Sequence, residues 1–279
     1  MRRRELLLGL AAAALAPRVA AAPKPVLWAR WEPYQAGSRL SVDHSAWDEL
    51  LARFHRRGAD GIARLAYAEI DGEANARLQF YLQELERVPV SQLDRPEQRA
   101  YWINLYNATT VAIVRRHYPI ASILDIRISP GLFTRGPWGA PVIRVERENL
   151  CLDDIEHRIL RPIWKDPRIH YALNCASLGC PDLDERAWRA EDLDSRLDAA
   201  ARRFVNHPRG AEVDGRGRLK VSSLYEWFKV DFGSRDAGVI EHLRRYAAPP
   251  LAERLASVER IEDDDYDWTL NDAAPPRAE

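Results

Sequence analysis

The densest group of residues able to do chemistry lies between His157 and Cys180. Cys175 ends an apolar stretch and precedes the small residues Ala-Ser-Leu-Gly, whose backbone amides are expected to point at an anion. A thiol in such a turn can have a lowered pKa, and a thiolate nucleophile needs a nearby imidazole that takes its proton. This pattern predicts a thiol-dependent hydrolase or acyltransferase with Cys175 as the nucleophile.

Two histidines are available as the base. Residues 168–175 (RIHYALNC) are predicted to form a buried strand that contains both His170 and Cys175. Five residues of separation would put these two side chains on opposite faces, about 17 Å apart along the strand. His157 belongs to another element and is not restricted in this way. We therefore predict that His157 is the catalytic base.

A long helix is predicted from Asp94, a suitable N-cap, to Arg116, with Pro96 in its first turn. Asn104 and Asn107 lie three residues apart on one face of this otherwise apolar helix. Burying an amide without partners costs about 1–3 kcal/mol, so polar groups should meet this face. We predict that Asn104 orients the imidazole or donates to an oxyanion, and that Asn107 binds the substrate.

Other residues of the cluster are predicted to bind the substrate. Arg161 lies one helical turn beyond His157 and can bind a carboxylate. His170 and Glu156 are assigned to the same predicted site. No cofactor is predicted, and the expected partner is a small-molecule or peptide substrate.

Three other interpretations of the cysteines stay open. Cys175 and Cys180 can form a disulfide across a short turn that contains glycine. Alternatively, His157, His170, Cys175 and Cys180 bind zinc, although their spacing matches no familiar ligand pattern. In the third interpretation both thiols are buried as small hydrophobic side chains, as expected for Cys151. Under these interpretations the protein is a non-catalytic binding or scaffold domain with a structural His/Cys/Asn network.

The surrounding elements alternate between helices and short strands without regular βα repeats. Periodic apolar residues predict helices over 43–55, 77–85, 192–204 and 239–247, and another after Ser223, which Glu226 helps to cap. Asp153 and Glu156 form a start like a capping box for a helix that ends at Pro162. Strands are predicted near 142–145, as a hairpin over 213–221 and, as a strand or turn, near 261–272. We expect an α+β fold, a single mixed domain with several helices around a small sheet.

The first 21 residues are typical of a signal peptide. Three arginines precede an apolar run that is too short to span a bilayer, and small residues follow up to the expected cleavage after Ala21. The pair Arg3-Arg4 resembles a twin-arginine export signal. We therefore expect a periplasmic or secreted protein. Its parts would be an N-terminal, mostly helical segment (22–89), a core (90–205), a C-terminal part of the same unit (206–272) and a disordered tail (273–279).

The charge balance argues against nucleic acid as a partner. The chain has 41 Lys and Arg against 42 Asp and Glu, whereas proteins that bind nucleic acid usually carry a basic excess. Removing residues 1–21 takes away four Arg and one Glu and leaves a mildly acidic chain. No second apolar stretch is long enough for a membrane span, so none is expected in the mature chain.

Several sequence blocks occur in an order that resembles a known family. They are WINLYNA (102–108), LDDIEH with Arg161, RIHYALNCASLGCP (168–181), SSLYEWFKVDFG and YDWTLND. These blocks resemble the family catalogued as domain of unknown function 547, most densely over residues 90–205. The resemblance implies that the family's motif positions are Asn104, Asn107, Glu156, His157, Arg161, His170, Cys175, Cys180 and Pro181. It implies no reaction, and a papain-like or transglutaminase-like fold is an analogy based on the His and Cys content.

Overall fold

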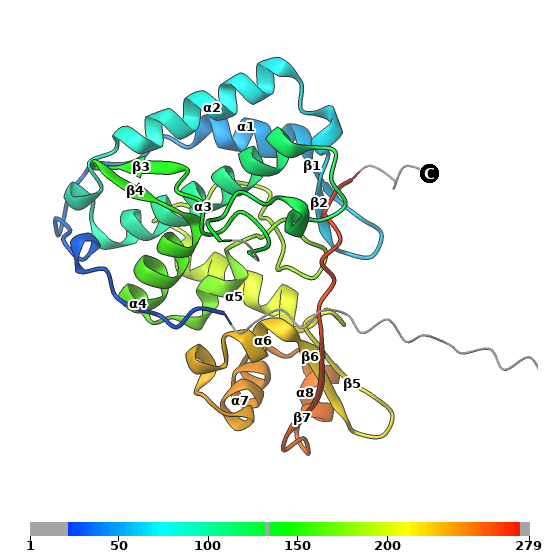
Figure 1. Ribbon diagram of the computed structural model, residues 1–279. Coiled ribbons are helices and arrows are strands. Elements are labelled where there is room, and N and C mark those ends of the chain that lie inside the picture. The colour runs from blue at the N-terminus through cyan, green and yellow to red at the C-terminus, as the bar shows by residue number, and fades with distance from the viewer. Residues whose placement is uncertain (1–21, 132–133, 274–279) are drawn as a thin grey trace, which may run out of the picture.

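The computed structural model describes residues 22–131 and 134–273, which form an α+β fold (Figure 1). The α-helices are α1 (Ser45–Phe54), α2 (Gly72–Arg87), α3 (Arg95–His117), α4 (Arg161–Trp164), α5 (Leu193–Val205), α6 (Ser223–Trp227), α7 (Asp236–Tyr246) and α8 (Pro249–Leu255). The strands are β1 (His55–Arg57), β2 (Ala63–Leu65), β3 (Ile143–Val145), β4 (Glu148–Leu150), β5 (Ala211–Val213), β6 (Leu219–Ser222) and β7 (Ile261–Asp265). The predicted α+β class is confirmed, whereas the likeness to papain stays an analogy.

Two predictions fall wholly or partly outside the described residues. The expected signal peptide, residues 1–21, is one of them. The other is the expected disordered tail, of which only Ala273 is described. The Ala273 amide donates to the carbonyl oxygen of Leu65 at 3.0 Å, so this residue is tied to the folded body.

The helix predicted from Asp94 is α3, and the core is built around it. Asp94 accepts a hydrogen bond from the Glu97 amide at 3.0 Å, as expected of an N-cap, and Pro96 lies in the first turn. Every residue from Gln98 to Val114 is buried. A helix that is buried on all sides must be covered by other elements on all sides. The polar side chains of α3 therefore have to find partners inside the protein.

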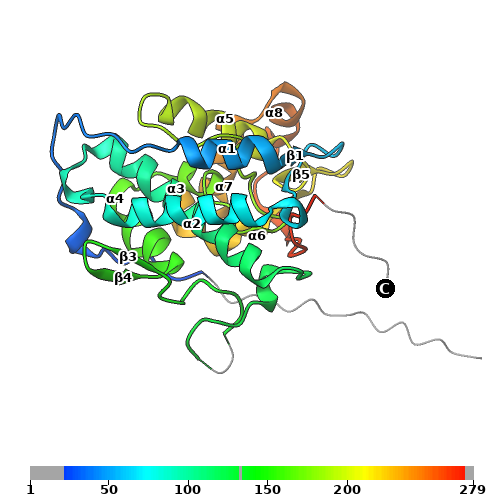
Figure 2. The same cartoon turned by 90° about the horizontal axis from the view of Figure 1, so that it is seen from above.

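Helices α1 and α2 cover one side of α3 (Figures 1 and 2). Both were predicted from their apolar periodicity, and each buries its apolar stripe. Helix α2 begins five residues earlier than the predicted range because Asp71 caps it and accepts a hydrogen bond from the Ala74 amide at 2.7 Å. These two helices form the wall of the protein behind α3.

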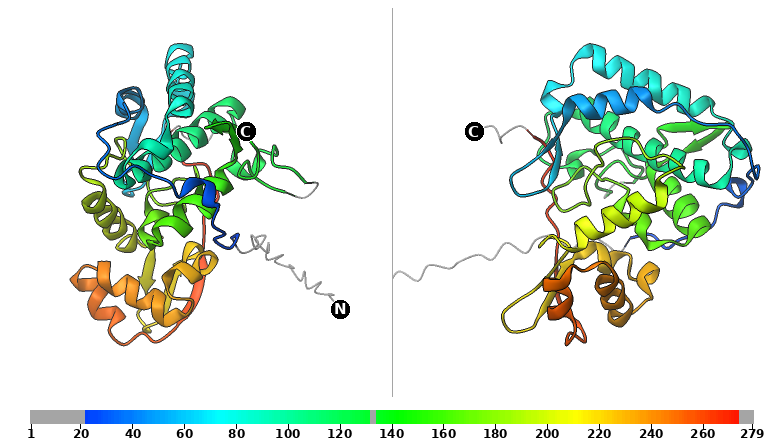
Figure 3. Two further views of the ribbon diagram at one scale, coloured as in Figure 1. Left: turned by 90° about the vertical axis from the view of Figure 1, so that its left-hand side faces the viewer. Right: turned by 180° about the vertical axis from the view of Figure 1, so that it is seen from behind.

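The C-terminal elements form a separate group on the opposite side of the molecule (Figure 3). The hairpin predicted over 213–221 is present as β5 and β6, which pair antiparallel. Strand β7 then adds to β6 in parallel register. Helix α6 packs against β6 and β7, α8 packs against β5, and α7 packs against α8.

After β7 the chain returns to the main body as an extended stretch that we call the return segment (residues 266–273). It runs beside residues 176–180, where the amides of Leu178 and Gly179 donate to the carbonyls of Thr269 and Asp267, both at 2.8 Å. The approach is so close that a Cβ at Gly179 would lie 2.7 Å from the Asp267 nitrogen. The return segment therefore fixes the loop that carries both cysteines.

The strand predicted over 168–175 is wrong. Residues Pro167–Tyr171 form a 3-10 helix instead, and the Asp166 carboxylate caps it by accepting from the Arg168 amide at 2.9 Å. An irregular stretch follows, which we call the cysteine loop (residues 172–181). A short buried apolar run does not distinguish a strand from other buried structure by its pattern alone. The argument that separated His170 from Cys175 consequently loses its basis.

The helix predicted from Asp153 to Pro162 is longer and is wound differently. Residues Asp154–Leu160 form a π-helix, which we call the π segment, and α4 continues the same helix past Pro162 to Trp164. Asp153 makes no capping bond; the Asp154 carboxylate accepts from the Cys151 amide at 3.0 Å instead. Such π-helical turns are rare and occur frequently at functional sites.

Candidate functional site

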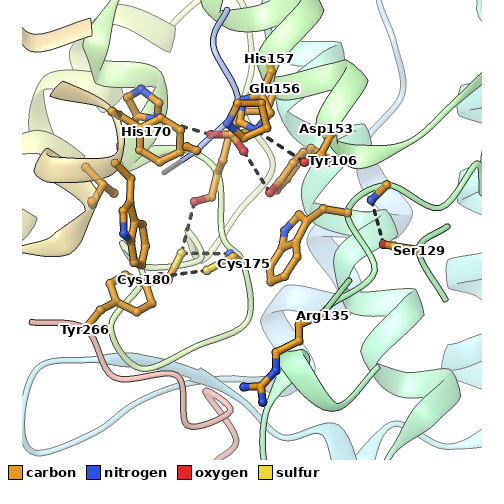
Figure 4. Close-up of a pocket in the computed structure, with 18 of the residues that line it drawn as sticks. Tyr106, Ser129, Arg135, Asp153, Glu156, His157, His170, Cys175, Cys180 and Tyr266 are labelled. Carbon is orange, nitrogen blue, oxygen red and sulfur yellow. Dashed lines mark hydrogen bonds and ion pairs between the residues drawn. The ribbon is translucent and has the colours of Figure 1, made fainter. Parts of the chain in front are cut away.

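A cavity of about 540 Å³ lies where the π segment, the cysteine loop, α3 and the C-terminal part meet (Figure 4). Its walls come from stretches that are far apart in the sequence. The lining residues are Ala22, Pro23, Tyr106, Ser129, Pro130, Thr134, Arg135, Trp138, Gly139, Asp153, Glu156, His157, His170, Leu173, Cys175, Cys180, Pro181, Leu224, Trp227, Phe228, Tyr266 and Trp268. Of the predicted site residues, the cavity therefore brings together Glu156, His157, His170, Cys175 and Cys180.

Cys175 and Cys180 lie next to each other as free thiols. The backbone amide of Cys175 donates to the Cys180 sulfur at 3.0 Å. The Cys175 sulfur is 2.9 Å from the Tyr266 hydroxyl and 3.3 Å from the Ser177 hydroxyl. Because Ser177 donates to the Tyr266 oxygen at 3.0 Å, the phenol hydrogen of Tyr266 is available for the sulfur of Cys175.

These contacts make the two thiols unequal. Burial raises the pKa of Cys175, but hydrogen bonding with Cys180, Ser177 and Tyr266 outweighs burial and holds this pKa below its ordinary value. Burial and the neighbouring Cys175 raise the pKa of Cys180 well above its usual range, and they do the same to the pKa of Tyr266. Cys175 is therefore the sulfur that ionises, while Cys180 and Tyr266 keep their protons.

Cys151 has the opposite character, as expected of a structural thiol. Its sulfur donates to the Asp154 carboxylate at 3.1 Å. Burial, together with this carboxylate, raises the pKa of Cys151 to about 12. The protein thus contains an internal reference thiol that is poorly reactive at neutral pH.

The π segment is held in place by the N-terminal strap, which we define as residues 22–28. Pro162 has no N–H, so one carbonyl in the preceding turn has no donor within the helix. This carbonyl belongs to residue 158 in an α-helix and to residue 157 in a π-helix. The amides of Val26 and Trp28 donate to the carbonyls of His157 and Arg158, both at 3.0 Å. The strap therefore satisfies the backbone at the position where Pro162 interrupts the hydrogen bonding.

A Val26→Pro variant should be less stable than the wild type by about 1–3 kcal/mol, because the buried His157 carbonyl would lose its partner. Thermal unfolding followed by circular dichroism measures this difference. Val26→Ala is the matched control, since the exposed side chain shrinks while the amide donor is kept. Equal melting temperatures for the two variants would show that the strap does not stabilise the π segment.

A continuous chain of polar contacts runs along the wall of the cavity. Glu156 accepts from the Tyr106 hydroxyl at 3.3 Å and lies 3.5 Å from Nδ1 of His170. The Nε2 atom of His170 is 2.7 Å from Asp231, which also accepts from Nε of Arg161 at 2.6 Å. His170 thus faces one carboxylate through each ring nitrogen. This geometry fixes the imidazole firmly.

Arg161 joins this chain to His157 and to the strap. Its Nη1 atom lies 3.1 Å from Nδ1 of His157 and donates to the Pro23 carbonyl at 2.6 Å. A guanidinium can only donate, so Nδ1 of His157 must accept. In the neutral ring the proton is therefore on Nε2, which lies 3.5 Å from the Asp153 carboxylate at the cavity wall. His157 consequently presents an N–H to the cavity rather than a lone pair.

The Asp231 carboxylate is kept ionised by its neighbours in this chain of contacts. Burial raises the pKa of Asp231, but hydrogen bonds from His170 and Arg161 outweigh burial and lower this pKa to about 2. Phe228 packs against the same groups, with its ring centre 4.0 Å from that of His170 and 4.8 Å from the Arg161 guanidinium carbon. Arg161 itself is almost fully buried and does not line the cavity. It acts here as a support for the site rather than as an open anion-binding group.

The two asparagines of α3 have partners other than those predicted. Asn104 is outside the cavity lining; its amide group bonds to the backbone N–H and C=O of Trp188 and to His44. Asn107 donates to the Ala172 carbonyl at 2.8 Å and accepts from the Asn174 amide at 2.9 Å. Both residues therefore attach irregular backbone to α3. Asn107 fixes the start of the cysteine loop at Ala172 and Asn174, three residues and one residue before Cys175.

The backbone amides that follow Cys175 do not point at a free anion position. The Ala176 amide donates to the Asn174 side chain at 3.0 Å, and the Cys180 amide donates to the Ser177 carbonyl at 3.2 Å. Those of Leu178 and Gly179 bind the return segment, as described above. The expectation of an anion-binding turn at 176–179 is thus not met for the amides of Ala176, Leu178 and Gly179.

Several lining residues were not singled out by sequence reasoning. Trp138, Trp227, Trp268 and Tyr266 form an aromatic wall, with ring centres 4.7 to 5.9 Å apart for the neighbouring pairs. Asp231 supports His170 from outside the predicted cluster. Most of these residues lie in two of the sequence blocks that resemble the family. Trp227 and Asp231 belong to SSLYEWFKVDFG, and Tyr266 and Trp268 belong to YDWTLND.

The described part of the chain shows neither a group of metal ligands nor a membrane-spanning helix. Within residues 22–131 and 134–273, no three His, Cys, Asp or Glu side chains are grouped as ligands for a metal ion. Among the same residues, no helix has the length and apolar character required to cross a bilayer.

Comparison with known proteins identifies one family. Residues 90–205 match the model of the family described as "Protein of unknown function, DUF547". No curated protein and no solved structure matches the chain. The matched segment contains Tyr106, Glu156, His157, His170 and both cavity cysteines, whereas the strap and Tyr266 lie outside it. Residues 90–205 of the chain are therefore similar to the DUF547 family, in agreement with the order of the sequence blocks.

Proposed function

We propose that the protein is a thiol-dependent hydrolase or acyltransferase in which Cys175 is the nucleophile. The observation that carries this proposal is the environment of the Cys175 sulfur. It lines a cavity, contacts the hydroxyls of Tyr266 and Ser177 and has a lowered pKa, whereas the adjacent Cys180 keeps its proton. Reactive cysteines occupy partially exposed sites of this kind, and structural cysteines do not.

The proposed reaction has two steps. In the first, the Cys175 thiolate attacks a carbonyl carbon, the new C–S bond forms, and the bond to the leaving amine or alcohol breaks, with a proton supplied from water. In the second, water or an amine attacks the thioester carbonyl, the C–S bond breaks, and the thiolate is restored as the incoming group loses a proton to solvent. In this proposal the hydrogen bonds to the Cys175 sulfur assist the loss of its proton, since they lower the pKa of this thiol.

The arrangement of His157 supports a function different from that of a base. Its Nδ1 lone pair is occupied by Arg161, and its Nε2–H end lies at the cavity wall. A neutral imidazole in this orientation can donate a hydrogen bond to a substrate carbonyl and polarise it. We propose this donor function for His157, with Arg161, Asp231 and His170 as positioning residues and with Asn107 as the support of the cysteine loop.

The lining suggests the kind of acyl compound that fits. Aromatic side chains form much of the wall, which favours an apolar or aromatic acyl group. The volume of about 540 Å³ suits a small molecule or the end of a peptide. Figure 4 shows the cysteines at one end of the drawn lining and His157 with Glu156 at another, so a substrate would lie between them.

We also propose that the protein is exported and is periplasmic or secreted. The support is the sequence of residues 1–21, with its arginine cluster, short apolar run and small residues before Ala22. N-terminal sequencing of the protein from a periplasmic fraction should give a start at Ala22. An intact N-terminus in the cytoplasmic fraction alone would contradict the proposal.

Labelling with iodoacetamide and with an activated acyl ester tests the catalytic proposal. At pH 7, Cys175 should be alkylated faster than Cys151 and faster than a free thiol such as N-acetylcysteine, and the ester should leave a thioester at Cys175. A Tyr266→Phe variant should move the alkylation profile to higher pH, because the donor to the sulfur is lost. Slow alkylation of Cys175 and the absence of an acyl adduct would instead indicate a binding or scaffold domain.

A further inference from the structure

Cys180 has no assigned function in acyl transfer, yet it lies next to the proposed nucleophile. The Cys175 amide donates to its sulfur at 3.0 Å, and the Cys180 thiol points toward the Leu173 carbonyl at 3.6 Å. The cysteine loop therefore folds back so that residue 180 contacts the backbone of residue 175. This contact is maintained by the return segment and by Asn174, whose side chain donates to the Pro181 carbonyl at 2.8 Å.

We propose that Cys175 and Cys180 form a reversible dithiol–disulfide couple whose oxidant is a hydroperoxide. Both cysteines line the cavity, but Cys175 is half-buried and open to a small molecule, whereas Cys180 is buried. A low-pKa, accessible thiol beside a second cysteine is the arrangement found in thiols that sense oxidants. This inference goes beyond acyl transfer, because that reaction needs Cys175 alone.

The chemistry balances in two steps. The Cys175 thiolate attacks one peroxide oxygen, the O–O bond breaks, and the departing oxygen takes a proton and leaves as water or an alcohol. The product is a sulfenic acid at Cys175. The Cys180 sulfur then attacks the Cys175 sulfur, the S–O bond breaks, and the hydroxyl leaves as water with the proton of the Cys180 thiol. Two electrons pass from the dithiol to the peroxide, and a reducing dithiol restores both thiols by exchange.

The disulfide would also block the proposed nucleophile. It places the nucleophilic sulfur in a bond to Cys180, so the oxidised protein could neither be alkylated nor acylated at residue 175. This consequence for turnover rests on the proposed function, whereas the disulfide chemistry itself does not. Cys151, bonded to Asp154 and without a neighbouring thiol in the described structure, should be unaffected by the same treatment.

Mass spectrometry of the full chain tests the couple directly. After brief treatment with hydrogen peroxide and alkylation in denaturant, the wild type should lose two hydrogens and carry one alkyl group, on Cys151. A peptide map should join Cys175 to Cys180, and dithiothreitol should reverse both changes. Over-oxidation of Cys175 without a bridge, or no change in either cysteine, would overturn the proposal.

Variants separate this proposal from the acyl-transfer proposal. Cys180→Ser should give a trapped sulfenic acid at Cys175 that reacts with dimedone, and Cys180→Ala should do the same if serine perturbs the fold. Cys151→Ser is the matched control and should form the bridge as the wild type does. If the wild type forms the bridge but has no esterase activity, acyl transfer is refuted and the dithiol–disulfide couple stands. If it has esterase activity but forms no bridge, the couple is refuted and acyl transfer stands.

Discussion

A Cys175→Ser variant should lose acyl-ester hydrolysis by about a thousandfold or more, because the hydroxyl of serine is not ionised in a site built for a thiolate. The measurement is the steady-state release of alcohol from an activated acyl ester at pH 7, with the wild type and the variant at equal folded concentration. Near-isosteric replacement keeps the packing of the cysteine loop. The loss should therefore appear in turnover and not in the melting temperature.

Cys151→Ser serves as the control for this measurement. It removes a thiol that is half-buried and bonded to Asp154 and does not line the cavity. Its ester hydrolysis should equal that of the wild type. If Cys175→Ser retained most of the activity, the nucleophile would have to be another group, and the assignment of Cys175 would be wrong.

An Arg161→Ala variant should be destabilised by about 3–5 kcal/mol, because it leaves the Asp231 carboxylate, which is only 16% exposed, without its guanidinium partner. The guanidinium bonds to Asp231, to His157 and to the Pro23 carbonyl, so its removal breaks three contacts between separate parts of the chain. Chemical denaturation with urea measures the free energy of unfolding. The same variant should also free Nδ1 of His157 and alter any pH dependence of turnover.

Arg158→Ala is the matched control on the same helix. Arg158 pairs with Asp154 at 2.8 Å, but its side chain is 43% exposed, and a surface ion pair of this kind contributes only about 0–1 kcal/mol. The difference between the two variants isolates the effect of burial. Equal destabilisation by the two substitutions would contradict the view that the Arg161 network supports the site.

Acidification should act through the same network. The pKa of Asp231 is about 2 in the folded protein, below the ordinary value of 3.8. A group whose pKa is depressed by folding stabilises the protein above its unfolded pKa, and this contribution is lost as pH falls toward the folded pKa. Wild-type stability should therefore decline between about pH 5 and pH 2. The decline should be shallower in Arg161→Ala, because Asp231 would lose one of the two groups that lower its pKa.

Local sequence signals were sufficient for several of the regular elements, but not for β1, β2, β4 or α8. Asp94 and Pro96 marked the start of α3, and the glycines at 215 and 217 marked the hairpin between β5 and β6. These features depend on capping and turn preferences of a few adjacent residues, which the sequence displays directly. The demand for polar partners around Asn104 and Asn107 was also met, although the partners are backbone groups of irregular segments.

The arrangement of the site could not be predicted, because it depends on contacts between residues far apart in the sequence. The apolar run at 168–175 did not distinguish a strand from a buried 3-10 helix, and the error in winding also misplaced His170 relative to Cys175. Nothing around Pro162 indicated that the strap would supply the missing backbone donors. The pairing of His170 with Asp231 spans 61 residues, so it follows from the tertiary fold alone.

The hydrogen bond from Tyr266 to Cys175 joins residues that are 91 positions apart, and it has a consequence for the order of synthesis. A ribosome adds about 5–20 residues per second, so the thiol is made several seconds before its activating phenol. Through that interval Cys175 has the reactivity of an ordinary thiol. The hydrogen-bonded environment that we propose to activate Cys175 is therefore complete only after residue 266 has been synthesised.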